Sequence, residues 1–198
     1  MARVVRIATA ADAGGVQAIY APFVADTAVS FEADPPTVAE MRGRIEGTLA
    51  GWPWLVCENG GVVAGYAYGS RHRERAAYQW SADVSVYIAP SYQRAGVGRA
   101  LYTALLALLV QQGYCNAYGG ITLPNAGSVG LHERLGFAPV GVYRQVGFKF
   151  GAWHDVGWWH LRLPAPAGDP PAPRPFPAIA GSGGCAAALA RGTALLQD

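Results

Sequence analysis

Two glycines two residues apart, in the segment SYQRAGVGRAL at residues 91–101, constrain this chain more than any other feature. The segment follows an apolar strand pattern that ends at Pro90, and it leads into an apolar helix pattern over residues 96–112. Because glycine has no Cβ, a ligand can approach the backbone N–H groups of such a turn closely. A helix N-terminus carries a partial positive charge, so the segment predicts a site for an anion such as a pyrophosphate, with Arg94 and Arg99 adding charge.

The spacing of the glycines differs from that of two common phosphate-binding loops. A dinucleotide fingerprint requires a third glycine where this chain has Leu101, and a Walker A loop requires Gly-Lys-Ser/Thr. A turn that only allows tight packing of the helix is the alternative that this pattern leaves open.

Residues 1–163 predict one mixed α/β domain with the element order β-α-α-β-β-β-α-β-α-β-β. Asn59-Gly60 separates two apolar runs and predicts a hairpin. Asp12 is expected to cap the first helix, and Thr37 with Glu40 has the spacing of a capping box for the second. Strands are expected at 3–8, on both sides of the turn within 52–70, and at 78–90, 115–122, 137–147 and 154–163. Helices are expected after residue 12, after residue 37, at 96–112 and within 125–136.

The first two helices show apolar residues at helical spacing. These residues are Val16, Ile19, Tyr20 and Phe23 in the first helix, and Val38, Met41, Ile45 and Leu49 in the second.

Composition narrows the class of protein. Hydrophobic residues make up 52% of the chain, which is typical of a folded protein, and the net charge of +2 does not favour a nucleic-acid partner. No apolar run is long enough to span a membrane, and the N-terminus does not resemble a signal peptide. We therefore expect a cytoplasmic protein without membrane or nucleic-acid partners.

The cysteines and histidines lack the spacing of metal ligands, so no metal site is expected. Cys57 and Cys115 are expected to be small buried residues in strands, with a catalytic thiol as the minor alternative. The third cysteine is Cys185.

The amino-acid composition of the chain changes at Pro164. Seven prolines stand within the fourteen residues 164–177, a composition that favours extended conformations. The last residues are expected to form a short helix or to be disordered. We interpret residues 164–198 as a variable tail without a catalytic role, and an arm that binds a partner or wraps around a dimer is the alternative.

The pattern Gln-Arg-x-Gly-x-Gly between a strand and an apolar helix, followed by NAGSVGLHERLGF, resembles the GNAT superfamily of N-acetyltransferases. Further segments, WPWLV, GVVAGYAY, LYTALL and WHDVGWW, are similar in the same order to phosphinothricin and methionine sulfoximine N-acetyltransferases, over residues 3–163. The resemblance implies an α/β (α+β) fold with a mixed, mostly antiparallel twisted sheet flanked by helices. It also implies acetyl-coenzyme A as co-substrate, a small-molecule amine acceptor and a homodimer.

The resemblance also assigns residues to the coenzyme. Backbone groups of the strand would pair with the pantetheine arm, the glycine turn would hold the pyrophosphate, and the later loop would add an amide and a hydroxyl. The residues are Val86, Tyr87, Ile88, Gln93, Arg94, Ala95, Gly96, Val97, Gly98, Arg99, Ala100, Asn125 and Ser128.

Two residues are expected to be catalytic on the same basis. Asp83 aligns with a carboxylate that is commonly Glu in the family; being one methylene shorter, it would act through a water or a shifted strand. An ion pair with a nearby arginine is the alternative. His132 occupies a slot near the departing sulfur where many relatives carry tyrosine, and an imidazole can donate or accept a proton near neutrality. The alternative is a helix histidine that packs and hydrogen-bonds to backbone.

The acceptor is expected to lie against two loops. Phe31 and Glu32 correspond to the first loop, and Arg73, Arg75 and Tyr78 to the second. Forked arginine donors suit the oxygens of a small acid, whereas a solvated charged connection is the alternative for this run. The segment FGAWHDVGWW is expected to shape the far wall of the acceptor site or a dimer contact. Plain core or interface packing is the alternative for its tryptophans, Trp153, Trp158 and Trp159.

The reaction expected from this resemblance is direct attack of an amine on the thioester in a ternary complex, without a covalent enzyme intermediate. Two other functions stay open at this point. One is acetylation of a protein or peptide N-terminus. The other is a non-catalytic acyl-coenzyme A sensor, which the replacement of Glu by Asp83 favours.

Overall fold

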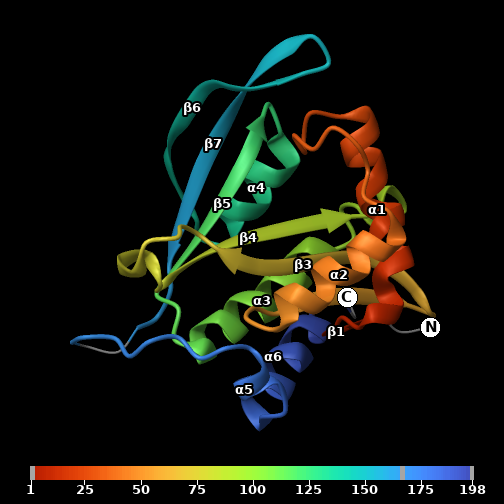
Figure 1. Ribbon diagram of the computed structural model, residues 1–198. Helices are drawn as coiled ribbons and strands as arrows, with labels where there is room; N and C mark the ends of the chain where they lie inside the picture. The colour runs from red at the N-terminus through yellow and green to blue at the C-terminus, as the bar shows by residue number, and fades with distance from the viewer. Residues whose placement is uncertain (1–2, 166–167, 197–198) are drawn as a thin grey trace.

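A computed structural model describes residues 3–165 and 168–196 (Figure 1). Seven strands form one sheet in the order β1-β2-β3-β4-β5-β7-β6. Every neighbouring pair is antiparallel except β4 and β5, which are parallel. The expectation of a mixed, mostly antiparallel sheet is confirmed. The strands are β1 (Arg3–Ile7), β2 (Trp54–Asn59), β3 (Val62–Arg71), β4 (Ser81–Ile88), β5 (Asn116–Leu123), β6 (Ala138–Lys149) and β7 (Ala152–Arg162).

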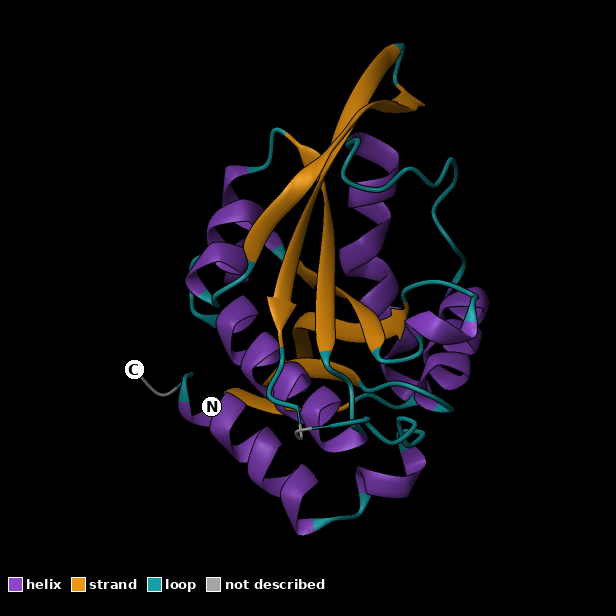
Figure 2. Cartoon of the chain, turned by 90° about the vertical axis from the view of Figure 1, so that its left-hand side faces the viewer, coloured by secondary structure: helices purple, strands orange, loops and turns teal. Residues whose placement is uncertain are grey.

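Helices cover both faces of the sheet, and the β6–β7 hairpin projects beyond them (Figure 2). On one face lie α1 (Ala13–Asp26) and α2 (Val38–Leu49). On the other lie α3 (Val97–Gln112), α4 (Ala126–Arg134), α5 (Pro177–Ala180) and α6 (Gly183–Ala194). Three short 3₁₀ helices span Ala10–Asp12, Ala76–Tyr78 and Pro90–Tyr92.

The sheet separates two hydrophobic cores. Successive residues of a strand point to opposite faces, so Leu55 and Cys57 pack with α3, whereas Trp54 and Val56 pack with α1 and α2. All four are buried, which explains why this strand reads as a continuous apolar run rather than an alternating one. The predicted burial of Cys57 in a strand is confirmed; Cys115 is also buried but lies just before β5.

Glycine positions determine where two hairpins turn. The first hairpin turns at Gly60 and Gly61, one residue later than Asn59-Gly60 suggests, and both glycines have positive φ. The last hairpin turns at Phe150 and Gly151, also with positive φ. Its strands therefore extend beyond the expected ends at 147 and 154.

Three local expectations differ from the structure. The strand expected from residue 78 starts at Ser81, because residues 76–78 form a 3₁₀ turn. Asp12 precedes α1, but its carboxylate binds the Arg6 guanidinium at 2.7 and 2.8 Å and makes no capping hydrogen bond to that helix. Val38 belongs to the apolar side expected for α2, yet it is exposed. The capping box of α2, by contrast, forms as expected.

The C-terminal tail packs against the main core. Phe176, Ile179, Cys185 and Ala188 are buried in the same cluster as α3. The Nε2 of Gln112 donates to the carbonyls of Gly51 and Arg174, both at 2.8 Å. For the last residues the sequence predicts a short helix or disorder. The helix is present as α6, and disorder is wrong for that segment.

Within the described residues, no helix is long and apolar enough to cross a membrane. Nor do three or more histidine, cysteine, aspartate or glutamate side chains gather in a group suited to a metal ion in that part of the chain.

The packing of α6 predicts that the tail stabilises the domain. Ala188 is fully buried, whereas Ala187, one residue earlier, is exposed. We expect Ala188→Asp to lower the free energy of unfolding by about 3 kcal/mol, because it buries an unpaired carboxylate. Ala187→Asp should leave it nearly unchanged. Urea denaturation followed by circular dichroism measures both, and equal stabilities would contradict a structural role for the tail.

Candidate active site

The strands β4 and β5 separate in the middle of the sheet. They pair only over Ser81–Asp83 and Asn116–Tyr118, and Asp83 with Tyr118 is the last pair. β4 continues to Ile88 and still pairs with β3 on its other side. The backbone groups of β4 that face away from β3 therefore have no strand partner beyond Asp83, and a ligand can occupy that position.

A cleft of about 910 Å³ opens where the strands separate, between β4, β5, α3 and α4. It is lined by most of the residues expected to bind the coenzyme, namely Val86, Tyr87, Ile88, Gln93, Arg94, Gly96, Val97, Gly98, Arg99, Asn125 and Ser128. Two expected residues, Ala95 and Ala100, do not line it. The Ala95 carbonyl accepts a hydrogen bond from Arg3 at 2.9 Å, and Ala100 is buried against α6.

The N-terminus of α3 opens into this cleft. The first hydrogen bond of the helix runs from the Ala100 N–H to the Gly96 carbonyl, and no side chain caps the turn. Three backbone N–H groups, at residues 97–99, thus have no partner within the helix. Gly96 has φ +79° and Arg94 φ +58°, so the turn depends on left-handed conformations that favour glycine. This geometry fits a pyrophosphate.

The first turn of α4 forms the opposite wall. The Asn125 side-chain oxygen accepts from the Ser128 N–H at 3.1 Å and so caps the helix, which leaves the amide nitrogen as the group suited to a ligand. The Ser128 carbonyl accepts from Nδ1 of His132 at 2.8 Å.

His132 is buried between α3, α4 and β5. A carbonyl can only accept, so Nδ1 carries the proton and Nε2 faces the Tyr102 hydroxyl at 3.2 Å. Burial lowers the pKa of His132, and the hydrogen bond to Ser128 opposes that shift. A Cβ on Gly119 would lie 2.6 Å from Nε2, so the glycine makes room for the ring. These contacts fit the packing alternative, and the ring also lines the cleft, so its catalytic role stays a prediction.

Asp83 and His132 lie on opposite faces of the sheet. Val84 packs with α3 and its core, and Asp83 therefore points toward the face of α1 and α2. Its Oδ1 lies 2.6 Å from Nδ1 of His72, on the loop between β3 and β4. Burial raises the pKa of the Asp83 carboxyl, and the hydrogen bond with His72 opposes the shift. The structure thus pairs Asp83 with a histidine, and not with an arginine as the alternative for this residue supposed.

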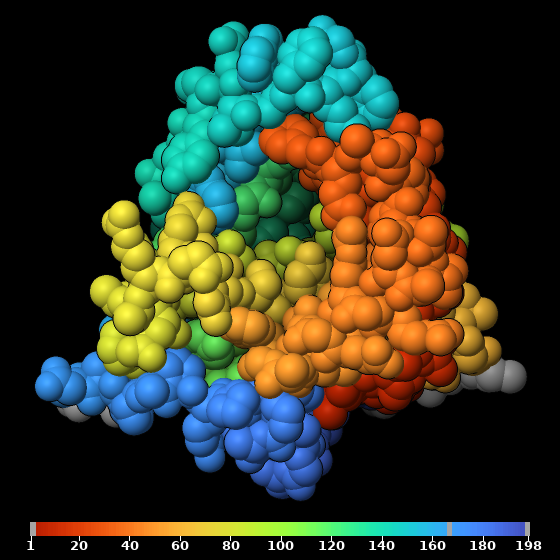
Figure 3. Space-filling model, viewed as in Figure 1, coloured from red at the N-terminus to blue at the C-terminus, as the bar shows by residue number. Residues whose placement is uncertain are grey.

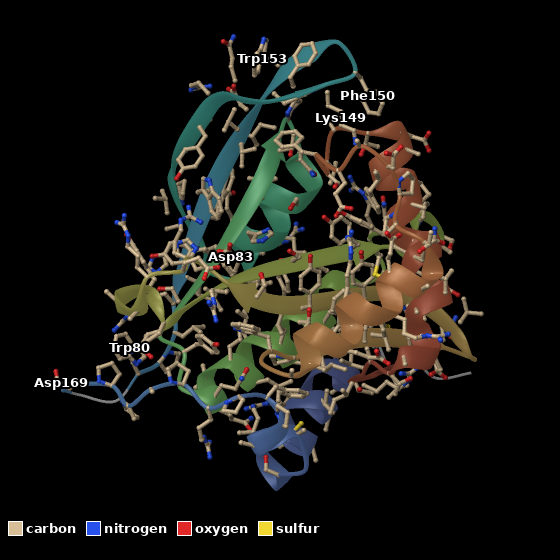
Figure 4. All side chains as sticks on the ribbon, viewed as in Figure 1. Trp80, Asp83, Lys149, Phe150, Trp153 and Asp169 are labelled. Carbon is tan, nitrogen blue, oxygen red and sulfur yellow. The ribbon has the colours of Figure 1, made fainter. Side chains whose placement is uncertain are left out.

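A hollow opens on this face of the molecule (Figure 3). Three segments surround it: the loop between α1 and α2, the loop between β3 and β4, and the β6–β7 hairpin. Asp83 lies beside it near the centre of the molecule, far from Asp169 (Figure 4). The hollow and the cleft meet where β4 and β5 separate. Ser85, two residues after Asp83 and therefore on the same face of β4, lines the cleft.

The hairpin is fastened to the α1–α2 loop. Nζ of Lys149 donates to the Val24 carbonyl at 2.6 Å and to the Ser30 carbonyl at 2.7 Å. The Phe31 ring packs against Gly147, where a Cβ would collide with it. Two segments far apart in the sequence thus form one wall of the hollow (Figure 4).

The residues expected to bind the acceptor come from two of these segments. The Glu32 carboxylate is held by Arg44 at 2.7 and 2.9 Å, and it accepts from the Tyr20 hydroxyl. Arg73 lies over the Trp158 ring, 5.5 Å from its centroid. Arg75 and Tyr78 are exposed on the second loop.

The three tryptophans of the last strand have different surroundings. Trp159 is buried and its Nε1 donates to Glu133 at 3.3 Å, whereas Trp153 is exposed on the hairpin. Trp158 lies beside Arg73 and His72, at the hollow.

Sequence reasoning missed several residues of these sites. His72 lies between Arg71 and Arg73 in a charged connection without a motif, and only its contact with Asp83 reveals it. Tyr102 and Arg134 line the cleft. Tyr102 follows Gly98 by one helical turn, a spacing that would have placed it on the same side of α3.

Comparisons with known proteins agree with this geometry. The sequence profile described as "Acetyltransferase (GNAT) domain" matches residues 5–158. Phosphinothricin N-acetyltransferase of Streptomyces viridochromogenes is 42% identical over 164 residues, which cover 82% of this chain and 90% of that protein. L-methionine sulfoximine/L-methionine sulfone acetyltransferase of Salmonella typhimurium is 34% identical over 160 residues, 80% of this chain and 94% of that protein.

A solved structure is also similar. It is the GNAT superfamily phosphinothricin acetyltransferase of Sinorhizobium meliloti in complex with AcCoA, with a TM-score of 0.81 and 32% identity, covering 86% of this chain and 94% of that one. The chain therefore belongs to the GNAT family of acetyltransferases and is an acyltransferase.

Proposed function

We propose that this enzyme transfers the acetyl group of acetyl-coenzyme A to the primary amine of a small amino-acid-like acceptor of the phosphinothricin or methionine sulfoximine class. The observation that carries the proposal is the position of Asp83, at the point where the cleft and the hollow meet. The cleft suits the coenzyme, because it offers unpaired strand groups for pantetheine and free helix N–H groups for pyrophosphate.

Direct attack in a ternary complex is the mechanism that fits these groups. The acceptor ammonium first loses a proton along a route that starts at Asp83, and the amine nitrogen then attacks the thioester carbon. The N–C bond forms, the C–S bond breaks, and the thiolate takes up a proton. A backbone N–H of β4 beyond Asp83 would polarise the carbonyl oxygen.

A proton-transfer role for His132 stays a prediction. In its neutral form Nε2 can only accept a hydrogen bond, and both the His132 ring and Tyr102, whose hydroxyl Nε2 faces, line the cleft. A proton could reach His132 through that hydroxyl. Donation to sulfur would require a charged ring, which burial disfavours.

The acceptor would be oriented by charge and by closure of the hollow. Arg73 and Arg75 stand on one bordering loop and can present forked donors to a carboxylate and a phosphinate or sulfoximine head. Phe31 and the hairpin form the opposite wall. These contacts support a small acceptor more than a peptide.

The first test replaces the carboxylate. We expect Asp83→Asn to lower kcat about 100-fold or more with phosphinothricin, because the base route loses its charge. Asp169→Asn removes an exposed carboxylate far from the site and should keep full activity. The measurement is thiol release from acetyl-coenzyme A with phosphinothricin, methionine sulfoximine and an amino-acid panel. Activity on peptides alone would contradict the acceptor class, and bound coenzyme without any thiol release would contradict the transferase.

The coenzyme turn can be tested by binding. Gly96→Ala places a side chain at φ +79°, and we expect the dissociation constant of coenzyme A to rise about tenfold or more because the turn is strained. Gly47→Ala on α2, where a Cβ meets nothing within 4 Å, is the control. Isothermal titration calorimetry measures both. An unchanged constant in Gly96→Ala would remove the turn from the coenzyme site.

We also propose a homodimer through the β6 edge. This outer strand leaves backbone groups unpaired, and apolar side chains are exposed along its hairpin. They are Val140, Val142, Tyr143, Val146, Phe148, Phe150 and Trp153.

Light scattering after size exclusion tests the dimer. We expect the parent protein to be dimeric and the double variant Phe148→Ser/Trp153→Ser to be monomeric, because both side chains are exposed within one protomer. Val62→Ser removes an exposed apolar side chain near the first hairpin turn and should stay dimeric. A monomeric parent protein would refute the interface.

A further inference from the structure

His72 is the one titratable side chain in hydrogen-bond contact with Asp83 among the described residues. A carboxylate only accepts, so at 2.6 Å the proton between them belongs to Nδ1 of His72 in the resting pair. This fixes the tautomer of the neutral ring: Nε2 keeps its lone pair. A histidine oriented in this way by a carboxylate is the usual arrangement of a general base.

Aromatic side chains hold the ring in this orientation. Tyr118 stacks on His72 with ring centroids 4.3 Å apart and planes at 14°, and His160 stacks on Tyr118 at 4.7 Å. Trp158 meets the ring edge-on at 6.1 Å. The ring therefore cannot turn without breaking the stack, and only Nε2 is left to meet a ligand.

Nε2 stays accessible. It makes no hydrogen bond to any described residue, and it is not one of the fully buried polar atoms that lack a partner. The side chain of His72 is 12% exposed and that of Asp83 25%. His72 belongs to the loop that borders the hollow (Figure 3), and its contacts with Asp83 and Trp158 support its assignment to the acceptor side of the sheet.

We propose that Nε2 of His72, oriented by Asp83, accepts the proton of the acceptor amine, so that the two residues work as one base. The inference rests on the function proposed above and specifies its base. It also explains how Asp83 can stand where relatives commonly have glutamate, since the imidazole extends the reach of the carboxylate, which is one methylene shorter. The carboxylate then stabilises the imidazolium that forms.

The proton balance closes with two transfers. Nε2 takes the first proton from the acceptor ammonium and later releases it to water. The amine attacks, the N–C bond forms and the C–S bond breaks. The second proton leaves the new amide nitrogen and ends on the coenzyme thiolate, so that one proton is released overall.

Other titratable or charged groups surround the pair. The titratable or charged side chains that face it from neighbouring elements are Arg73 and Tyr78 on the same loop, Tyr68 on β3, Tyr118 on β5 and, behind Tyr118, His160 on β7. Among the described side chains, only the imidazole of His72 forms a hydrogen bond with Asp83.

The variant His72→Phe tests the proposal, because phenylalanine keeps the stacking on Tyr118 and removes the base. We expect kcat to fall about 100-fold while KM for acetyl-coenzyme A stays unchanged, since His72 does not line the cleft. Asp169→Asn, which removes an exposed carboxylate far from the site, should keep both values.

Two further measurements make the test specific. The double variant His72→Phe/Asp83→Asn should be no slower than either single variant, because the residues act as one unit. In ¹⁵N-labelled parent protein, imidazole nitrogen shifts should assign the proton of neutral His72 to Nδ1, and Asp83→Asn should change them. Full kcat in His72→Phe with an active parent, or a proton on Nε2, would overturn the assignment of His72 and leave the proposed transferase intact. An inactive parent that still binds the coenzyme would overturn both.

Discussion

The separation of β4 from β5 after Asp83 is the constraint on which the rest of the structure depends. These two strands form the one parallel pair of the described sheet, and a parallel pair requires a long crossover between its strands. Here the crossover is α3, which begins close to the open end of β4. The N-terminus of α3 therefore lies at the cleft that this separation creates. One topological feature thus brings together unpaired strand groups, an unsatisfied helix end and a carboxylate.

The same strand divides the chemistry between two faces of the sheet. Residues that alternate along β4 point in turn to the α3 core and to the hollow, so the single step from Val84 to Asp83 changes the environment completely. His132 is fixed on the first side by hydrogen bonds at both nitrogens. Asp83 and His72 meet on the second. In the proposed mechanism, proton transfer from the amine therefore falls to His72, on the opposite face of the sheet from His132.

Much of the fold follows from local patterns, because hairpin turns, the capping box of α2 and the glycine turn before α3 are each determined by residues close in sequence. The contact between His72 and Asp83 could not be predicted in this way. It depends on how a loop of arginines folds back, and the ring is held by Tyr118 and Trp158 from two later strands. The strand expected from residue 78 was wrong for a related reason, since that loop turns before β4 begins.

The tail shows how residues outside a site can shape it. Gly192 of α6 packs so closely on α3 that a Cβ there would lie 2.7 Å from the Ala100 carbonyl, and Leu195 lies behind Gly96. Thr193 also accepts a hydrogen bond from the Val5 N–H of β1, and Arg3 of that strand donates to Ala95. The glycine turn is therefore packed from behind by both ends of the chain. Since a preformed turn loses less entropy when it binds an anion, these contacts favour affinity for the coenzyme without touching it.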